Sequence, residues 1–424
     1  MKNLLFILPL IISGTAFGQR TPAATNTDKV CITGGTFHLG NGTSLEEGVL
    51  VIQDGKIASL GTETDLSDCD RRIEAQGKHI YPGFIAPNST LGIAEIGAVR
   101  ASQDQRETGS FNPHVRSIIA YNPESRVTET VRSNGVLIAQ ITPRGGWISG
   151  SSTVVQLDAW NWEDAVIALD EGLHLNWPSK YKQSGWWAEP GPIEVSKKYG
   201  EQKEALTTML QNAKTYKGKG SDLRMEAMQW IFKGSQTLYI HCNAAKEIRD
   251  ALILKNELGI EKMVIVGGYE ADLVSDALVE SQVAVLLRRV HDLPIHKDGN
   301  IHKPFELPAK LSALGVEFAF QNAGDMEQMQ TRNLPSYGGT AVAFGLDYEL
   351  AVKALTYTPA KILGIQEKYG SLEIGKSATL FISNGDALDM LTNSLEHAFI
   401  DGRHIDIGNR QKDLYEKFSK KYAE

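Results

Sequence analysis

Imidazole and carboxylate side chains follow several apolar runs of the chain. His241 comes directly after Leu238–Ile240, His291 follows the run 283–287, and Asp325 follows the run 316–320. Either residue type titrates near neutral pH once its surroundings shift its pKa. We therefore take Asp325 and His291 as candidate general bases. His296 and His302 lie on the same loop as His291. Two interpretations of this loop stay open: a metal site displaced to it, or histidines that are simply solvated.

Two further segments offer binding groups. Residues 141–152 follow an apolar run and contain Arg144 among glycines and serines, a combination that suits a carboxylate or carbonyl as well as a plain glycine-rich turn. Residues 173–178, together with Trp186 and Trp187, place aromatic side chains in what reads as a long connection. Such a connection either covers a ligand or packs on the fold.

The elements that must position these residues lie in residues 84–365. Here short apolar runs alternate with helical patterns, over a length close to the ~250 residues typical of a (β/α)8 barrel. The runs are 84–85, 136–141, 238–240, 263–266, 283–287 and 316–320. Periodicity alone leaves an open doubly wound sheet as the alternative to a closed barrel.

Both flanks of this region are rich in strand patterns. Residues 19–83 contain Asp54-Gly55 between apolar runs, and residues 366–408 contain a second such pair, Asp401-Gly402. Asp-Gly between apolar runs is typical of a hairpin. Since each flank is too short to fold alone, we expect them to form one small composite β-sandwich, followed by a helix over 409–424.

The junctions of these regions resemble the amidohydrolase superfamily of metal-dependent hydrolases, in particular its imidazolonepropionase-like branch. Residues 77–85 (GKHIYPGFI) are similar to the entry into that family's first barrel strand, and 55–61 to its N-terminal hairpin. Residues 358–364 (TPAKILG) resemble its last barrel helix, and 370–376 (GSLEIGK) the return into the sandwich. The order and spacing of all four motifs fit, which implies an α/β fold with a TIM-like barrel plus the composite sandwich.

The resemblance also implies a divalent, zinc-like metal, and here the chain departs from the family. The first strand of the family ends in Asp-x-His-x-His, whereas this chain has Asn88 and Thr90 at the histidine positions. Neutral oxygen donors replace imidazole poorly toward zinc. Only His241 matches a ligand, Gly267-Gly268-Tyr269 stands where the next histidine is expected, and Asn322 stands near the position of the catalytic aspartate.

At face value the resemblance implies hydrolysis of a non-peptide carbon–nitrogen bond in a small cyclic or linear amide. Asp325 and His291 are then the catalytic candidates, and Asn88, Thr90, Arg144 and Asn322 line the pocket. The alternative is a non-catalytic subunit that binds a small molecule or supports an intact amidohydrolase in a hetero-oligomer; a homo-oligomer is also open.

Composition and the N-terminus bear on partners and compartment. The 43 basic and 51 acidic side chains give a net charge of −8, which argues against a nucleic-acid partner. Lys2, the apolar run 4–12 and the small residues 13–18 predict a cleavable signal peptide of residues 1–18 and a periplasmic or secreted protein. Nine apolar residues are too few for a membrane span. Cys31 and Cys69 either pair in that oxidising compartment or stay as thiols, with Cys242 left over.

Overall fold

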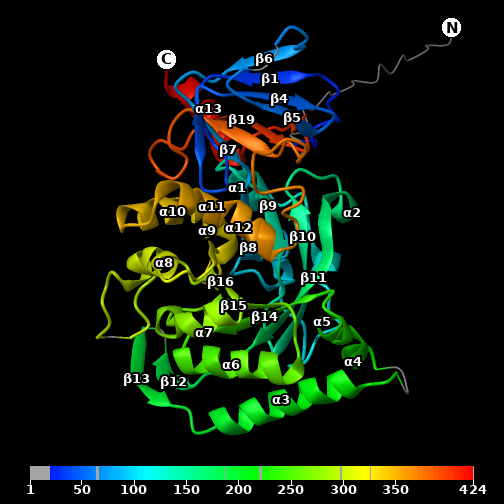
Figure 1. Cartoon of the computed structure of the whole chain (residues 1–424), viewed down its shortest axis with the longest axis vertical. Coiled ribbons are helices and arrows are strands. Elements are labelled where there is room, and N and C mark those ends of the chain that lie inside the picture. The colour runs from blue at the N-terminus through cyan, green and yellow to red at the C-terminus, as the bar shows by residue number, and fades with distance from the viewer. Residues whose placement is uncertain are drawn as a thin grey trace, which may run out of the picture.

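The computed structural model describes residues 20–63, 66–186, 188–218, 222–296, 298–324 and 326–423. The predicted signal peptide and Asp325 lie outside these ranges. A β-sandwich stands above a barrel, and α3 (Tyr199–Thr215) runs along the far end of the barrel (Figure 1).

Eight strands form a nearly closed barrel sheet, which confirms the predicted α/β class and barrel. In sheet order the strands are β17 (Phe318–Phe320), β16 (Ala284–Leu287), β15 (Met263–Gly267), β14 (Thr237–Cys242), β11 (Val166–Asn176), β10 (Ile148–Gln156), β9 (Val136–Ile141) and β8 (Phe84–Ser89). All six predicted apolar runs are strands of this sheet. One strand departs from a uniform repeat, because β10 runs antiparallel to both β9 and β11.

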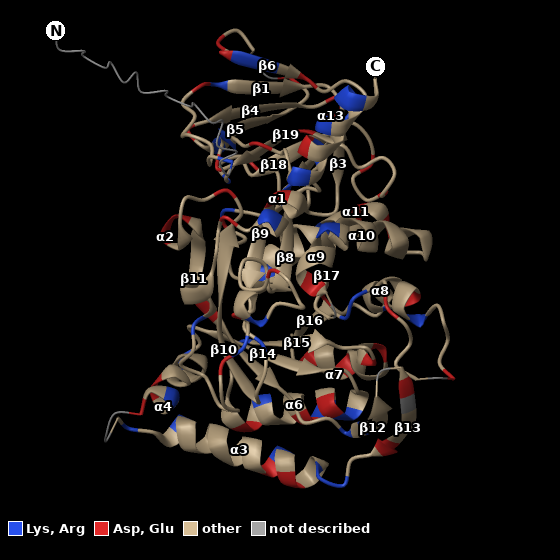
Figure 2. Cartoon of the chain, turned by 180° about the vertical axis from the view of Figure 1, so that it is seen from behind, with Lys and Arg blue, Asp and Glu red and all other residues tan. Residues whose placement is uncertain are grey.

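Helices connect and cover these strands. The remaining ones are α1 (Arg126–Arg132), α2 (Trp162–Ala165), α4 (Leu223–Ala227), α5 (Gln229–Phe232), α6 (Ala245–Leu258), α7 (Ser275–Glu280), α8 (Lys303–Ala313), α9 (Glu327–Gln330), α10 (Leu334–Ala343), α11 (Tyr348–Leu355), α12 (Tyr357–Ile362) and α13 (Arg410–Tyr422). α6 ends where Gly259 takes a left-handed conformation that satisfies the last carbonyls. Acidic and basic residues are interspersed along α3 and α6 (Figure 2).

Two sheets built from both ends of the chain form the β-sandwich. One contains, in order, β5 (Lys56–Gly61), β4 (Val49–Gln53), β1 (Val30–Thr33) and β6 (Arg71–Glu74); the other contains β20 (Arg403–His404), β19 (Leu395–Ile400), β18 (Leu380–Ser383), β7 (His79–Pro82), β2 (Thr36–His38) and β3 (Ser44–Glu46). β18 pairs with β7 across almost 300 residues of sequence. Asp54 and Gly55 both have positive φ in the predicted hairpin turn.

Cys31 and Cys69 form a disulfide within the sandwich, and Cys242 is free and buried. The cross-link ties β1 to the segment that leads into β6. It settles the open alternative for these two cysteines.

The assignment of residues 173–178 to a connection is wrong for its first part. Leu173–Asn176 complete β11, whose last residues pair in parallel with β14. The β-branched enrichment that marks the other strands is missing here, and His174 and Asn176 disguise the strand. The aromatic connection begins later, where β12 (Tyr181–Trp186) and β13 (Glu189–Val195) form a hairpin.

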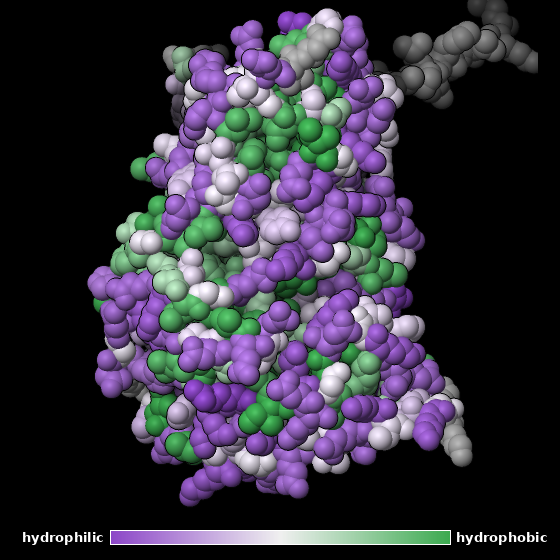
Figure 3. Space-filling model, viewed as in Figure 1, coloured by the Kyte–Doolittle hydropathy of each residue, from purple (hydrophilic) through white to green (hydrophobic). Residues whose placement is uncertain are grey.

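Apolar residues on the face seen in Figure 3 gather over the sandwich and in smaller groups over the barrel. Among the described helices, none is both long and apolar enough to cross a membrane.

Candidate functional site

A pocket of about 780 Å³ opens where the carboxyl ends of the barrel strands meet. We call it the mouth pocket. Its lining comes from the ends of β8 and β14, the segments after β8, β9 and β17, and α9: Asn88, Thr90, Ala94, Glu95, Ile96, Gly97, Ala98, Gln103, Gln105, Arg106, Arg144, His241, Ala323, Gly324, Met326, Glu327, Gln328 and Met329. Four predicted site residues, Asn88, Thr90, Arg144 and His241, therefore lie at one pocket.

Arg144 clamps the wall of this pocket. Its Nε and Nη2 donate to the two carboxylate oxygens of Glu327 at 3.1 and 3.2 Å. Nη1 donates to Asn88 Oδ1 at 2.9 Å and Nη2 to the Asn88 carbonyl at 2.7 Å, and the carbonyls of Thr142 and Pro143 accept from Nη1. All five N–H groups of the guanidinium are thus bound to protein oxygens. We call this arrangement the arginine clamp.

Asn88 fits this position for a backbone reason as well. Its φ is +51°, a left-handed conformation that asparagine tolerates better than most residues. Its amide nitrogen donates to Gln321 Oε1 at 3.3 Å, and its backbone N–H donates to Gln140 Oε1 at 2.8 Å. Every polar group of Asn88 is therefore engaged by protein.

A chain of hydrogen bonds leads from His241 into the barrel. His241 Nε2 lies 2.9 Å from His174 Nδ1, and His174 Nε2 lies 3.0 Å from Ser152 Oγ. Ser152 Oγ donates to Glu171 Oε1 at 2.5 Å. Four side chains from three adjacent strands, β10, β11 and β14, form this interior chain, and His241 is its end at the mouth pocket.

A bulge in β11 turns the Glu171 side chain toward Ser152 and the rest of this interior chain. Ser152 pairs with Gly172 but Val154 pairs with Ala168, so β11 carries two extra residues opposite β10. Asp170, with φ of +49°, lies in this bulge, and such bulges re-aim side chains. Glu171 Oε1 also accepts from Gln140 Nε2 at 2.7 Å, and Glu171 Oε2 accepts from the Tyr239 hydroxyl at 3.0 Å.

The carboxyl and the imidazoles of the interior chain have pKa values that are shifted in opposite directions. Burial raises the pKa of Glu171 to about 7, against hydrogen bonds from Ser152, Gln140 and Tyr239 that lower it. Burial, and then the charge of Arg144, lower the pKa of His241 to about 3. Burial also lowers the pKa of His174, with His241 and Arg144 adding to the effect. Both imidazoles are therefore neutral at pH 7, while Glu171 changes charge near it.

The other predicted site residues lie elsewhere. His291 Nε2 is 2.7 Å from Thr340 Oγ1, and neither His291 nor Asn322 lines the mouth pocket. Asn322 is buried, where it donates to the Glu327 carbonyl and accepts from the Tyr337 hydroxyl. Asn322 thus supports the segment that contains Glu327, the partner of Arg144. Asp325 lies outside the described residues.

The donor set does not fit a divalent metal. In the described parts of the chain, no group of three or more histidine, cysteine, aspartate or glutamate side chains is placed to hold an ion. The guanidinium of Arg144 binds Asn88 at the first-strand position, and a second cation there meets its repulsion. The histidines of the loop after β16 do not converge either, since His296 pairs with Glu270 and His291 with Thr340.

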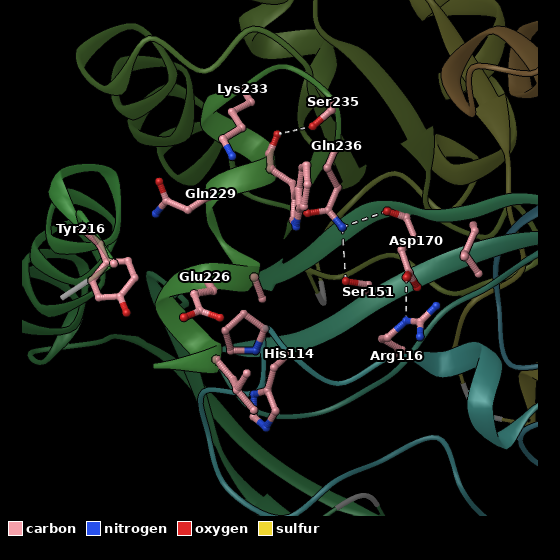
Figure 4. Close-up of a pocket in the computed structure, with 16 residues that line it drawn as sticks. His114, Arg116, Ser151, Asp170, Tyr216, Glu226, Gln229, Lys233, Ser235 and Gln236 are labelled. Carbon is pink, nitrogen blue, oxygen red and sulfur yellow. Dashed lines mark hydrogen bonds and ion pairs between the residues drawn. The ribbon is translucent and has the colours of Figure 1, made fainter. Parts of the chain in front are cut away.

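Two other pockets complete the view. A pocket of about 280 Å³ beneath the β12–β13 hairpin shares only His241 with the mouth pocket. A larger hollow of about 870 Å³ lies on the outer side of β10 and β11 (Figure 4). There Arg116 pairs with Asp170 at 2.6 Å, and Gln236 donates to Ser151 Oγ and the Asp170 carbonyl. It contains none of the predicted site residues.

Sequence reasoning missed Glu171, His174, Ser152, Gln140 and Glu327. One signal was available for part of this set, because Gln140 interrupts the apolar run of β9 and a polar residue inside a buried strand needs a partner. Nothing in the spacing announces the bulge that re-aims Glu171.

Comparison with known proteins agrees with this architecture. Residues 310–405 match the model of the amidohydrolase family. The chain is 22% identical over 372 residues to a 5′-deoxyadenosine deaminase of Methanobrevibacter smithii, covering 82% of each chain.

Solved structures share the fold. An amidohydrolase from Thermotoga maritima superposes with a TM-score of 0.75 at 24% identity, over 89% of this chain and 99% of the other. A Xaa-Pro dipeptidase superposes with a TM-score of 0.54 at 14% identity, over the same shares of the two chains.

Proposed function

We propose that this chain, a member of the amidohydrolase superfamily, hydrolyses a non-peptide carbon–nitrogen bond of a small molecule in the mouth pocket, with His241 as its base and without a metal. The observation that carries the proposal is the position of His241. Its Nε2 is held by His174, while its Nδ1 has no hydrogen-bond partner within the described part of the chain and the ring lines the pocket. The deaminase relative, by its name, also breaks a carbon–nitrogen bond.

In this proposal a water molecule between His241 and the ligand gives its proton to His241 Nδ1 and attacks the carbonyl or amidine carbon. Arg144 contributes positive charge near the developing oxyanion, since its N–H groups are already occupied by protein oxygens. Thr90 supplies the free donor, because its buried hydroxyl has no partner among the residues that the structure describes. The departing nitrogen takes the proton back from His241.

Superfamily members usually bind a divalent metal that activates water. The arginine clamp and the neutral Asn88 and Thr90 support a different solution in this chain. In this proposal the positive charge at the site belongs to the Arg144 side chain rather than to a bound metal. A chelator is therefore expected to leave turnover unchanged.

The test is a hydrolysis screen on purified chain, with and without chelator. The probes are simple amides, lactams, amidines and aminopurine nucleosides, with released ammonia or amine measured by mass spectrometry. We expect chelator-resistant turnover that falls about 10²-fold or more in His241→Asn, the scale of general-base catalysis. His302→Asn, at an exposed histidine away from the pocket, is the matched control. Turnover that chelator abolishes and zinc restores overturns the proposal.

A second candidate is binding without catalysis, including the role of partner subunit to an intact amidohydrolase. The arginine clamp favours it, because its N–H groups are already occupied. Two buried oxygens at the pocket wall, Glu95 Oε1 and Gln105 Oε1, favour it as well: they have no partner within the described ranges and suit a ligand rich in N–H or O–H donors. Calorimetric binding of a screened compound by both wild type and His241→Asn, with no product from either, selects this candidate.

We also propose that the protein is exported. The Cys31–Cys69 disulfide supports an oxidising compartment, where such bonds persist. N-terminal sequencing of the chain recovered from the periplasm or medium is expected to begin near Gln19. A chain that stays in the cytoplasm with Met1 intact contradicts export.

A further inference from the structure

We infer that Glu171 is the proton store for His241, reached through His174 and Ser152, so that the interior chain converts the mouth-facing nitrogen of His241 between acceptor and donor. This inference rests on the proposed function for its role in turnover, but the relay itself is a property of the protein alone. Glu171 and His174 act through His241 and are positioning residues.

The donors around Glu171 fix the direction of the chain when its carboxylate is ionised. Ser152, Gln140 and Tyr239 all donate to it. Ser152 Oγ lies 2.5 Å from Glu171 Oε1 and 3.3 Å from the Gly172 carbonyl, so the carboxylate takes its only hydrogen and Ser152 Oγ accepts from His174 Nε2–H. His174 Nδ1 then accepts from His241 Nε2–H, and His241 Nδ1 presents a lone pair to the pocket.

Protonation of Glu171 inverts every bond in the chain. The carboxylic acid donates to Ser152 Oγ, Ser152 donates to His174 Nε2, and His174 Nδ1–H donates to His241 Nε2. His241 Nδ1 then carries a hydrogen toward the pocket. One proton taken up at Nδ1 appears as one proton on Glu171, through three short transfers along the chain, and no charge is left on either imidazole.

This arrangement explains how a histidine of low basicity can serve as a base. The charge of Arg144 and burial oppose an imidazolium at position 241, whereas a carboxyl whose pKa is near 7 accepts the proton readily at neutral pH. Three charged or titratable groups face the interior chain. Arg144 faces the two histidines, and Asp170 and the Tyr239 hydroxyl face Glu171. The Tyr239 ring stacks on His174 at 4.6 Å between centroids and fixes its orientation.

The experiment follows both ends of the chain by NMR on intact protein, without ligand. Carboxyl carbon shifts report the charge of Glu171, and imidazole nitrogen shifts report which nitrogen of His174 and His241 carries hydrogen. We expect Glu171 to titrate near pH 7 and both histidines to exchange tautomers with the same midpoint. Histidine tautomers that stay constant through the titration of Glu171 overturn the inference.

Two variants separate the relay from a general effect of pH. Glu171→Gln abolishes the tautomer exchange near pH 7, because the amide cannot take the proton. Ser152→Ala leaves Glu171 titrating but uncouples the histidines from it. Ser151→Ala is the matched control: it lies next to Ser152 on β10, contacts Gln236 on the outer side, and keeps the exchange. Exchange that persists in Ser152→Ala also overturns the inference.

The same variants distinguish failure of the relay from failure of the proposed function. If Glu171 and the two histidines titrate together but no hydrolysis is found, the relay is retained and the proposed enzymatic function is rejected. Conversely, hydrolysis that survives Glu171→Gln with an unchanged pH profile retains His241 as the base and rejects the relay.

Discussion

The two halves of the barrel interior differ in kind. On the side of β9, β10, β11 and β14 a continuous polar network runs through the interior beside apolar side chains such as Ile138 and Val154; on the side of β15, β16 and β17 the barrel interior is lined by apolar side chains. The polar half holds Gln140, Ser152, Glu171, His174, Tyr239 and His241, and the apolar half holds Val264, Val266, Leu286 and Ala319. The family resemblance implies metal ligands on both halves, whereas the described polar network lies on one of them.

The irregular strands lie in the polar half. The antiparallel β10 and the bulge of β11 both occur there, and together they bring Ser152 and Glu171 into contact. The apolar half keeps regular parallel pairing, and its strand β15 ends in Gly267-Gly268, which carries no side chain able to bind a ligand. The irregular strands thus carry the polar network, and the regular ones carry apolar side chains.

Removal of the arginine clamp is expected to have the largest effect on stability. Arg144→Ala leaves Glu327 and the Asn88 oxygens without their partner in a largely buried site, with 16% and 13% of the Arg144 and Glu327 side chains exposed. Breaking a buried pair in this way costs about 3–5 kcal/mol. Urea unfolding measures the loss, with the exposed Arg106→Ala as control. A cost below about 1 kcal/mol indicates that the clamp is incidental.

The apolar half is expected to respond to loss of volume rather than to pH. Leu286 is fully buried, so Leu286→Ala removes packed methyl groups and costs about 2–5 kcal/mol at pH 5 and at pH 8 alike. Leu273→Ala, at a side chain 58% exposed, is the control. A strongly pH-dependent cost for Leu286→Ala contradicts the division of the interior into two halves.

The division also explains what the sequence could predict. Asn88, Thr90, Arg144 and His241 each lie at or just after the carboxyl end of a strand, and because these ends share one face of a barrel, their proximity follows from the fold. Glu171 and His174 lie inside β11, where a bulge decides which way the side chains point. Hydrogen-bonding partners such as Glu327 come from helices whose docking depends on tertiary packing. The catalytic and binding roles assigned from the sequence stay predictions.

The polar half is expected to respond to pH through Glu171. Its pKa rises from 4.5 to about 7 on folding, so the folded state binds more protons than the unfolded state between these values. Stability therefore falls as pH rises through this window, by up to about 3 kcal/mol at 1.36 kcal/mol per pKa unit. Glu171→Gln removes this pH-dependent loss. Its free energy of unfolding, measured with urea, is therefore expected to rise relative to that of wild type from pH 5 to pH 8. Glu163→Gln, at an exposed glutamate, is the control, and parallel pH profiles for wild type and Glu171→Gln reject the assignment.

The smallest effect is expected from a single hydroxyl in the polar half. Tyr239→Phe removes a donor to Glu171, which costs about 1.5–3 kcal/mol while the carboxylate is charged and about 0.5–1.5 kcal/mol once it is protonated. The variant therefore loses more stability at pH 8 than at pH 5, and the pKa of Glu171 rises further because a hydrogen bond to its charged form is gone. Tyr121→Phe is the matched control, since the buried Tyr121 hydroxyl has no partner in the described part of the chain and its loss leaves no group there unpaired. Equal costs for Tyr239→Phe at both pH values mean that Tyr239 contributes packing alone, and that the carboxylate is held by Ser152 and Gln140.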